Sequence, residues 1–204
     1  MVKNFSQHCE NNKQVINNVL VDAFKDCTQI LEIGSGTGQH AIFFASHLPN
    51  AIWHTSVQST YIESLTTNLL ASNLANIRSP LVLDVTKPWP LEKGIHAIDG
   101  IFTANSLHIM SAAMVESFFN GMGEHLKQGG QLCIYGPFNY NGNNTSDSNA
   151  AFDVRLKENN TLSGIKDFEW ICDLAKAQGL ILQGDHEMPA NNRVLHFFKS
   201  TTNK

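Results

Sequence analysis

The sequence predicts an α/β fold, a single domain with a seven-stranded and mostly parallel sheet. Short apolar runs alternate with segments of helical periodicity, which is typical of strand–helix–strand crossover units. A glycine-rich turn separates the first apolar run from the helix that follows it. A chain of 204 residues, 42% of them hydrophobic, is long enough for one domain with a sizeable core. We therefore assign residues 1–204 to one domain.

The first half of the chain is expected to alternate regularly. Apolar residues at helical spacing predict an amphipathic helix that includes residues 15–24, and residues 1–25 are assigned to an amino-terminal helical flap. Two strands follow, each with a helix after it, and then a short third strand. The strands are expected at 29–33, 51–55 and 80–85, and the helices at 41–48 and 60–69.

The second half continues the same pattern and closes on a hairpin. Helical spacing predicts a helix within 111–126 and a last helix that includes residues 168–175 and stops at Gly179. Apolar runs predict strands at 98–104, 131–135, 180–182 and 194–198. Because a short loop joins the last two, we expect them to be antiparallel at one edge of the sheet.

Residues 139–149 interrupt this alternation. The segment is polar, rich in asparagine and long for a connection inside a compact domain. One interpretation is a surface loop without a role. The other is a lid over a site at the carboxyl edge of the sheet, where such folds bind ligands. We favour the lid.

Composition excludes several classes of function. Eighteen Asp and Glu against fourteen Lys and Arg give a formal charge of −4, which argues against a dedicated nucleic-acid groove. No stretch approaches the roughly 20 apolar residues of a membrane-spanning helix. The first residues lack the apolar core of a secretory signal, so we expect a cytoplasmic protein. The four cysteines are scattered without metal-ligand spacing, so we expect reduced thiols and no metal site. The oligomeric state is left open.

The glycine turn at 34–38 narrows the choice of ligand. A phosphate-binding P-loop needs a lysine after its glycines, and none is present. A dinucleotide turn favours glycine or alanine where this chain has Gln39, and an acidic residue about 20 positions further on. What remains is Glu32 followed by G-x-G-x-G, which resembles the first motif of class I S-adenosylmethionine-dependent methyltransferases.

The resemblance extends to a narrower family. The chain resembles the methyltransferase-like 26 family, small uncharacterised proteins of bacteria and animals. The segments that carry the resemblance are 10–13, 31–41, 83–86, 104–109, 135–138, 148–153 and 187–192. It implies a class I methyltransferase (Rossmann-like) fold with strand order 3-2-1-4-5-7-6 and an antiparallel last strand. It also implies binding of S-adenosylmethionine, but no particular substrate.

The resemblance implies a set of cofactor-binding residues. Asp84, with Val85 beside it, is expected to accept a hydrogen bond from the adenine amino group, or else to cap a turn. Glu32 is expected to reach the amino-acid end through water, or else to bond nearby backbone amides. Asn105 shapes the pocket. The glycine turn supplies the remaining candidates, namely Gly34, Ser35, Gly36, Thr37 and Gly38.

One position departs from the family. The second strand usually ends in an Asp that binds both ribose hydroxyls, whereas this chain has Val57 there. Valine cannot accept a hydrogen bond, so Gln58 or Ser56 is left to substitute in part. Either the cofactor binds more weakly or the ligand differs.

Candidates for chemistry and for acceptor binding lie further along the chain. His108 follows the fourth strand and is a candidate general base, because histidine titrates near neutral pH; the alternative is a histidine that only fixes a turn. The resemblance also points to residues that either line the acceptor pocket or only cap loops and helix ends. These are Asn12, Lys13, Tyr135, Asn149, Asp153, Asn191 and Asn192.

The sequence thus predicts methyl transfer from S-adenosylmethionine to a small-molecule acceptor, with S-adenosylhomocysteine as product. Positioning the reactants supplies much of the rate in such a displacement, so few catalytic side chains are required. The alternative, motivated by Val57, is a non-catalytic module that keeps the fold to bind the cofactor or a partner. Nicotinamide-dependent oxidoreduction is disfavoured by Gln39.

Overall fold

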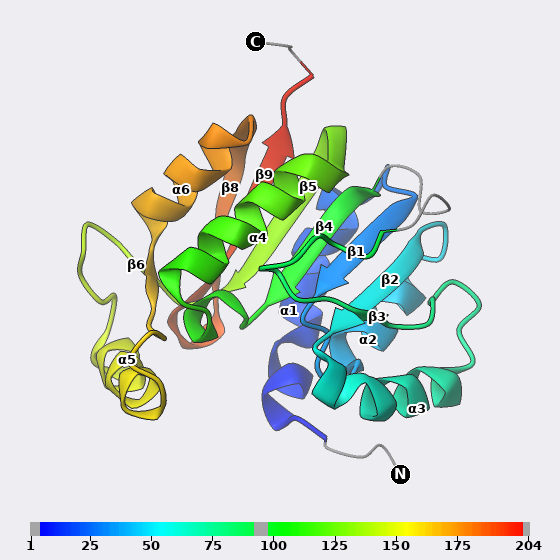
Figure 1. Cartoon of the computed structure of the whole chain (residues 1–204), viewed down its shortest axis with the longest axis horizontal. Helices are drawn as coiled ribbons and strands as arrows, with labels where there is room; N and C mark the ends of the chain where they lie inside the picture. Colours follow the sequence, from blue (N-terminus) through cyan, green and yellow to red (C-terminus); the bar gives the residue numbers. More distant parts are fainter. Residues whose placement is uncertain (1–4, 92–97, 202–204) are drawn as a thin grey trace.

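The computed structural model describes residues 5–91 and 98–201, and its main feature is a seven-stranded sheet (Figure 1). The strands of this sheet are β1 (Gln29–Ile33), β2 (Ile52–Val57), β3 (Leu81–Val82), β4 (Ile98–Ala104), β5 (Leu126–Gly136), β8 (Leu180–Met188) and β9 (Asn192–Lys199). Their order is β3-β2-β1-β4-β5-β9-β8. Counted within this sheet, that is 3-2-1-4-5-7-6, so the predicted order is confirmed.

The direction of the strands also agrees with the prediction. The first five strands pair in parallel, whereas β9 is antiparallel to both β5 and β8. Parallel neighbours place their carboxyl ends at one edge of the sheet, and in doubly wound folds ligands bind there. This edge faces α3 (Ile62–Ser72), α5 (Asp147–Asn159) and the start of α1 (Gln7–Ala23) (Figure 1).

The described part of the chain forms six α-helices. They are α1 (Gln7–Ala23), α2 (Gln39–His47), α3 (Ile62–Ser72), α4 (Ala112–His125), α5 (Asp147–Asn159) and α6 (Phe168–Ala177). Short 3₁₀ turns are η1 (Ser59–Tyr61), η2 (Leu107–Ile109) and η3 (Pro189–Asn191), and two short parallel strands, β6 (Phe138–Asn139) and β7 (Lys166–Asp167), form a separate sheet. Serine side chains accept a backbone N–H at the start of three helices: Ser6, Ser111 and Ser146.

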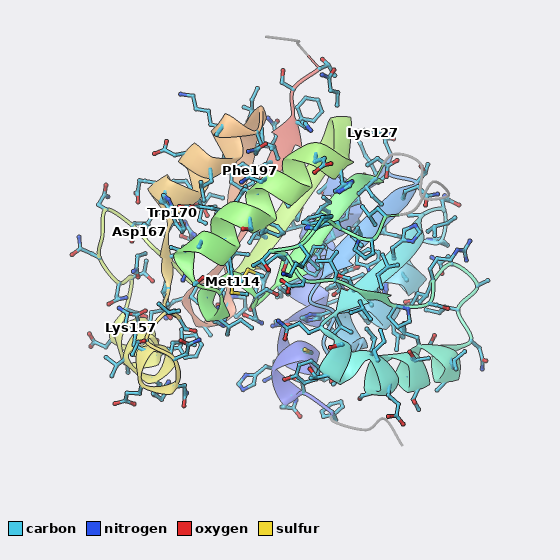
Figure 2. All side chains as sticks on the ribbon, in the orientation of Figure 1. Met114, Lys127, Lys157, Asp167, Trp170 and Phe197 are labelled. Carbon is cyan, nitrogen blue, oxygen red and sulfur yellow. The ribbon has the colours of Figure 1, made fainter. Side chains whose placement is uncertain are left out.

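Two hydrophobic layers hold the helices on the sheet. Helices α4 and α6 cover one face, where Phe197 of β9 belongs to the same cluster that Met114 packs against (Figure 2). Helices α1 and α2 cover the other face, where Phe44 packs near Trp53. Alternate residues of β1 therefore enter opposite layers. Each large side chain buried this way contributes roughly 1.5–3 kcal/mol.

The structure differs from the prediction after β5. Residues 139–149 are not one continuous loop, because Asn139 ends β6 and α5 begins at Asp147. Helix α5 was not predicted because it lacks a continuous apolar stripe, and its Val154 is 55% exposed. The lid role of the remaining residues stays a prediction. Over the described residues, no helix has both the length and the apolar character needed to cross a bilayer.

Candidate functional site

The glycine turn has a backbone shape that other residues rarely adopt. Gly34, Gly36 and Gly38 have φ values of 78°, 53° and 83°, in the left-handed region. A Cβ on Gly34 would lie 2.7 Å from Oγ of Ser106, so a side chain there would clash. A Cβ on Gly36 would meet no atom within 4 Å, because this residue faces open space at the end of β1. The turn therefore leaves room for a ligand next to its backbone.

The turn is held in this shape by neighbouring elements. The amide of Ser35 donates to the carbonyl of Ser56 at 2.8 Å, which fixes the turn to the end of β2. The amide of Gly38 donates to the carbonyl of Ser35 at 2.8 Å. Asn68 of α3 donates through Nδ2 to the carbonyl of Thr37 at 2.9 Å. The site is therefore largely preformed.

Glu32 is buried behind the turn. Nε1 of Trp53 donates to its Oε2 at 3.1 Å, and the Ser35 side chain also hydrogen-bonds the carboxyl group. Burial raises the pKa of Glu32 to about 7, because the charged form is poorly solvated there. The side chain bonds neighbouring side chains, rather than the backbone amides that one of the sequence interpretations expected.

The residues at the end of β2 differ in their exposure to solvent. Val57 is buried in a cluster with Leu65 and Leu69. Ser56 is buried as well, and its Oγ donates to the carbonyl of Glu32 at 2.7 Å. Gln58 is exposed. Of the two residues expected to substitute in part for the Asp of the family, only Gln58 is exposed.

Asp84 occupies a turn. Its Oδ1 accepts hydrogen bonds from the backbone amide and the hydroxyl of Thr86, at 2.9 and 2.8 Å. These bonds lower the pKa of the exposed Asp84 carboxyl. Val85 is buried in the layer under α4. Asp84 thus has the turn role that the sequence left open, and its remaining acceptor atoms face solvent.

Asn105 directly follows β4 and has a left-handed conformation, with a φ of 55°. Its amide donates to the carbonyl of Tyr135 at 2.9 Å, so it is fixed to β5. Because β4 is the direct neighbour of β1 in the sheet, Asn105 follows the strand next to the one that ends at the glycine turn. This is the position expected for a residue that shapes the pocket.

His108 is packed rather than free. It is 8% exposed, and its ring lies 5.2 Å from the ring of Phe152 of α5 in an edge-to-face arrangement. Its carbonyl accepts the amide of Gly164 at 2.9 Å. Burial, with a smaller effect from Lys166, lowers the pKa of His108 to about 4. The imidazole is therefore neutral at physiological pH.

Helix α1 docks on the helix that follows the glycine turn. Asn12 is buried, with Oδ1 2.7 Å from Nε2 of His40, and it also hydrogen-bonds the side chain of Tyr135. Gln39 exchanges two hydrogen bonds with the backbone of Ser6. Lys13 pairs with Glu10 and lies over the ring of Phe43, 4.8 Å from its centroid. Residues 1–4 of the predicted flap lie outside the described residues.

The remaining acceptor candidates lie around α5 and the β8–β9 turn. Nδ2 of Asn149 donates to the carbonyl of Asn191 at 3.2 Å. Asp153 accepts the amide of Ile165 at 2.7 Å and pairs with Lys157. Nδ2 of Asn192 donates to the carbonyl of Pro189. The candidates thus form two groups. Asn12, Lys13 and Tyr135 lie on the α1 side, and the other four lie around α5 and the β8–β9 turn.

The sequence did not single out some residues that the structure places at these sites. Gln39 entered only as a departure from the dinucleotide motif, yet it anchors the start of α1. Ser106 closes against Gly34, and Phe152 covers His108. Phe152 belongs to the family-specific segment 148–153, which was the only signal available. Over residues 5–91 and 98–201, no group of three His, Cys, Asp or Glu side chains is placed to hold a metal.

Comparison with models of known protein families assigns the chain to one family. A family model described as "Protein of unknown function (DUF938)" matches residues 3–199. The chain belongs to the DUF938 family. The narrower resemblance to the methyltransferase-like 26 family stays a prediction.

Solved structures of methyltransferases share the fold of this DUF938 protein. An O-methyltransferase family protein from Burkholderia thailandensis has a TM-score of 0.81 at 16% identity, over 94% of this chain and 57% of its own. An O-methyltransferase family 2 protein from Planctomyces limnophilus, in complex with apigenin, also has a TM-score of 0.81, at 14% identity over 94% and 57%. Human N-acetylserotonin methyltransferase, in complex with S-adenosylmethionine, has a TM-score of 0.72 at 14% identity over 93% and 55%. The chain thus has the class I methyltransferase fold and spans a little over half the length of these proteins.

Proposed function

We propose that this DUF938 protein binds S-adenosylmethionine and transfers its methyl group to a small molecule. The observation that carries the proposal is the open backbone at Gly36, in a rigid turn between β1 and α2. Gly36 has no side chain and faces outward at the carboxyl edge of a parallel sheet. A ligand can therefore approach the backbone closely at this residue. The methyltransferases of known structure with the same fold support the choice of cofactor.

The residues present suit an adenosyl amino acid. The turn from Gly34 to Gly38 would hold its amino-acid and ribose portions, and exposed Gln58 is the polar group at the end of β2. Asp84 has acceptor atoms that face solvent for the adenine amino group. When bound, S-adenosylmethionine supplies a sulfonium methyl group that is transferred by in-line displacement and leaves S-adenosylhomocysteine as product.

His108 is the candidate base of this site. Its pKa of about 4 keeps the ring unprotonated at neutral pH, so a ring nitrogen is open to accept a proton, although as a weaker base than a free histidine. It lies beside the end of β5, since Nδ1 is 3.8 Å from where a Cβ on Gly136 would be. The packing against Phe152 orients the ring and excludes water from one side of it.

Calorimetric titration tests cofactor binding. We expect heat on adding S-adenosylhomocysteine or S-adenosylmethionine to the full chain, and a raised melting temperature with either ligand. Absence of both signals would overturn the proposal.

A non-catalytic binding module is the second candidate, favoured by the burial of Val57 where a ribose carboxylate is expected. Incubation with methyl-labelled S-adenosylmethionine and a broad set of small molecules separates the two functions. A single labelled product would exclude the non-catalytic function, whereas cofactor binding without any labelled product would support it.

A further inference from the structure

A pocket of 370 Å³ opens at the end of the β8–β9 hairpin, away from the glycine turn. We call it the hairpin pocket, and its volume is within the range of roughly 300–1,000 Å³ that small-ligand sites occupy. Its lining includes Tyr140, Thr145, Glu187, Asn191, Asn192 and Arg193. We propose that the hairpin pocket binds an uncharged group rich in hydroxyl or amide groups, and that this group is the distal end of the methyl acceptor.

The wall that carries Arg193 is built as a fixed polar cluster. Nε and Nη2 of Arg193 donate to the two carboxylate oxygens of Asp185, at 2.8 and 3.2 Å. The hydroxyl of Tyr140 donates to the same carboxylate at 2.7 Å. A two-point contact of this kind holds the guanidinium plane in one orientation. Arg193 is therefore part of the scaffold of the pocket.

The charges that line the pocket already satisfy each other. Nη1 of Arg193 lies 3.0 Å from Oε1 of Glu187. A cationic ligand would meet the guanidinium, and an anionic ligand would have to displace the carboxylate, so either charge is disfavoured. The other polar groups of the lining are the amides of Asn191 and Asn192 and the hydroxyl of Thr145. Such groups match hydroxyls and amides of an uncharged ligand.

The wall at the hairpin end is strained and held from outside. Ala190 and Asn191 both have left-handed backbones, with φ values of 57° and 55°, which is unfavourable for Ala190 and tolerated by asparagine. Helix α5 holds them, because Nδ2 of Asn149 donates to the carbonyl of Asn191 and Nδ2 of Asn191 donates to Oγ of Ser148. Strained residues persist only when their surroundings fix them. The pocket is therefore formed before any ligand binds.

The strand register gives the spacing between Arg193 and the end of β4, the strand that precedes His108. Arg193 of β9 pairs with Gly136 of β5, and Tyr135 of β5 pairs with Ala104 of β4. Neighbouring strands lie about 4.8 Å apart, so the backbone of Arg193 is roughly 10 Å from the end of β4. An acceptor of about that length can reach both. Only this last step rests on the proposed function, because the chemistry of the pocket does not depend on it.

Binding of four sugars with one ring size tests the inference. Methyl glucoside and N-acetylglucosamine are neutral, glucosamine is cationic and glucuronate is anionic. The readout is the side-chain amide signals of Asn191 and Asn192 in the full ¹⁵N-labelled chain. We expect the neutral sugars to shift these signals and to bind at least fivefold more tightly than glucosamine or glucuronate. A charged sugar that binds more tightly than both neutral ones, or no shift with any of the four, would overturn the proposal.

Three variants test where the sugars bind. Thr145→Tyr fills the pocket and should abolish the shifts, whereas Thr67→Tyr on the exposed face of α3 is the matched control and should not. Glu187→Gln leaves Arg193 without its partner in the pocket, so glucuronate should then bind at least fivefold more tightly than to the unmodified chain. Shifts that survive Thr145→Tyr would overturn the site. Titration with S-adenosylhomocysteine is run in parallel, so a failure of donor binding is recognised separately from a failure of the pocket.

Discussion

Oδ1 of Asn12 lies 2.7 Å from Nε2 of His40, so the first helix is hydrogen bonded to the helix that starts at the glycine turn. The contact is buried on both sides, and the His40 ring also stacks on Phe44 with centroids 5.2 Å apart. The bonds between Gln39 and Ser6 fix the start of the same helix. Helix α1 is thus fixed to the first turn of α2, directly after the glycine turn.

Asn12→Leu should lower the free energy of unfolding by about 1–3 kcal/mol, because two buried polar partners, His40 and Tyr135, lose their hydrogen bonds. Urea denaturation at neutral pH measures the change. Asn18→Leu on the exposed side of α1 is the matched control and should change stability by less than about 0.5 kcal/mol. Equal stability of the two variants would contradict the docking role.

Gly36→Ala should weaken binding of S-adenosylhomocysteine at least tenfold, because the new methyl group points into the open space of the turn. Gly179→Ala is the control, since Gly179 also has a positive φ, 77°, and nothing within 4 Å of the added Cβ. Both variants bear a similar backbone strain of about 1 kcal/mol. Calorimetry should find donor affinity unchanged in the control. Equal loss in both would mean that strain, and not the ligand, explains the effect.

The main fold was predictable from sequence because its signals are local. Apolar runs marked all seven strands of the main sheet, and the strand order followed from the resemblance. Helix α5 was missed because its buried face is made by Asn149 and Asp153, which bond loops and not a hydrophobic layer. A polar helix of this kind has no periodic signal in one sequence.

The site was predictable only in part. The glycine turn has a local signature, and its position at the sheet edge followed from the fold. The roles of Asn12 and Val57 depend on the residues that pack against them in the folded chain. The spacing of residues along the sequence does not specify these partners. The pairing of Arg193 with Asp185 joins two strands of a hairpin whose register was unknown.

Gln58→Glu should strengthen binding of S-adenosylhomocysteine about fivefold, because hydrogen bonds to a charged acceptor exceed neutral ones by roughly 1 kcal/mol. Gln183→Glu on β8 carries the same change in charge away from the turn and should have no effect on the affinity measured by calorimetry.

Val57→Asp, which restores the carboxylate of the family, is expected to behave differently. Its side chain would enter the cluster of Leu65 and Leu69, so it should lower the melting temperature. Tighter binding by Val57→Asp than by Gln58→Glu would contradict this assignment of the ribose side.

His108→Ala should lower turnover at least tenfold while donor affinity stays nearly unchanged, since the side chain is placed beyond the glycine turn. Labelled methyl transfer measures the rate, and calorimetry measures the affinity. His108→Gln preserves much of the contact with Phe152 and serves as the check on packing. If His108→Gln keeps the full rate, the base assignment is wrong.

Stability should fall in acid because His40 and His108 are buried without charge. Burial lowers the pKa of each to about 4 from an ordinary value near 6.5. Between these values the unfolded chain binds more protons, so the free energy of unfolding falls as pH drops from 6.5 to 4. Each histidine contributes about 3 kcal/mol, at 1.36 kcal/mol per pKa unit. Glu32 acts in the opposite sense: its pKa is raised to about 7, so its contribution is complete below pH 4.5 and is lost as pH rises through 7.

Urea denaturation from pH 4.5 to 7.5 measures the balance of these groups. His40→Leu should flatten the loss of stability on the acid side, since the contribution of this buried histidine is removed. Glu32→Gln should steepen it, because the opposing carboxyl is gone. The exposed His47, replaced by Leu, provides the control and should leave the slope as it is in the unmodified chain. A slope unchanged by His40→Leu would show that this ring binds protons equally in the folded and unfolded chain, and would contradict the lowered pKa of His40.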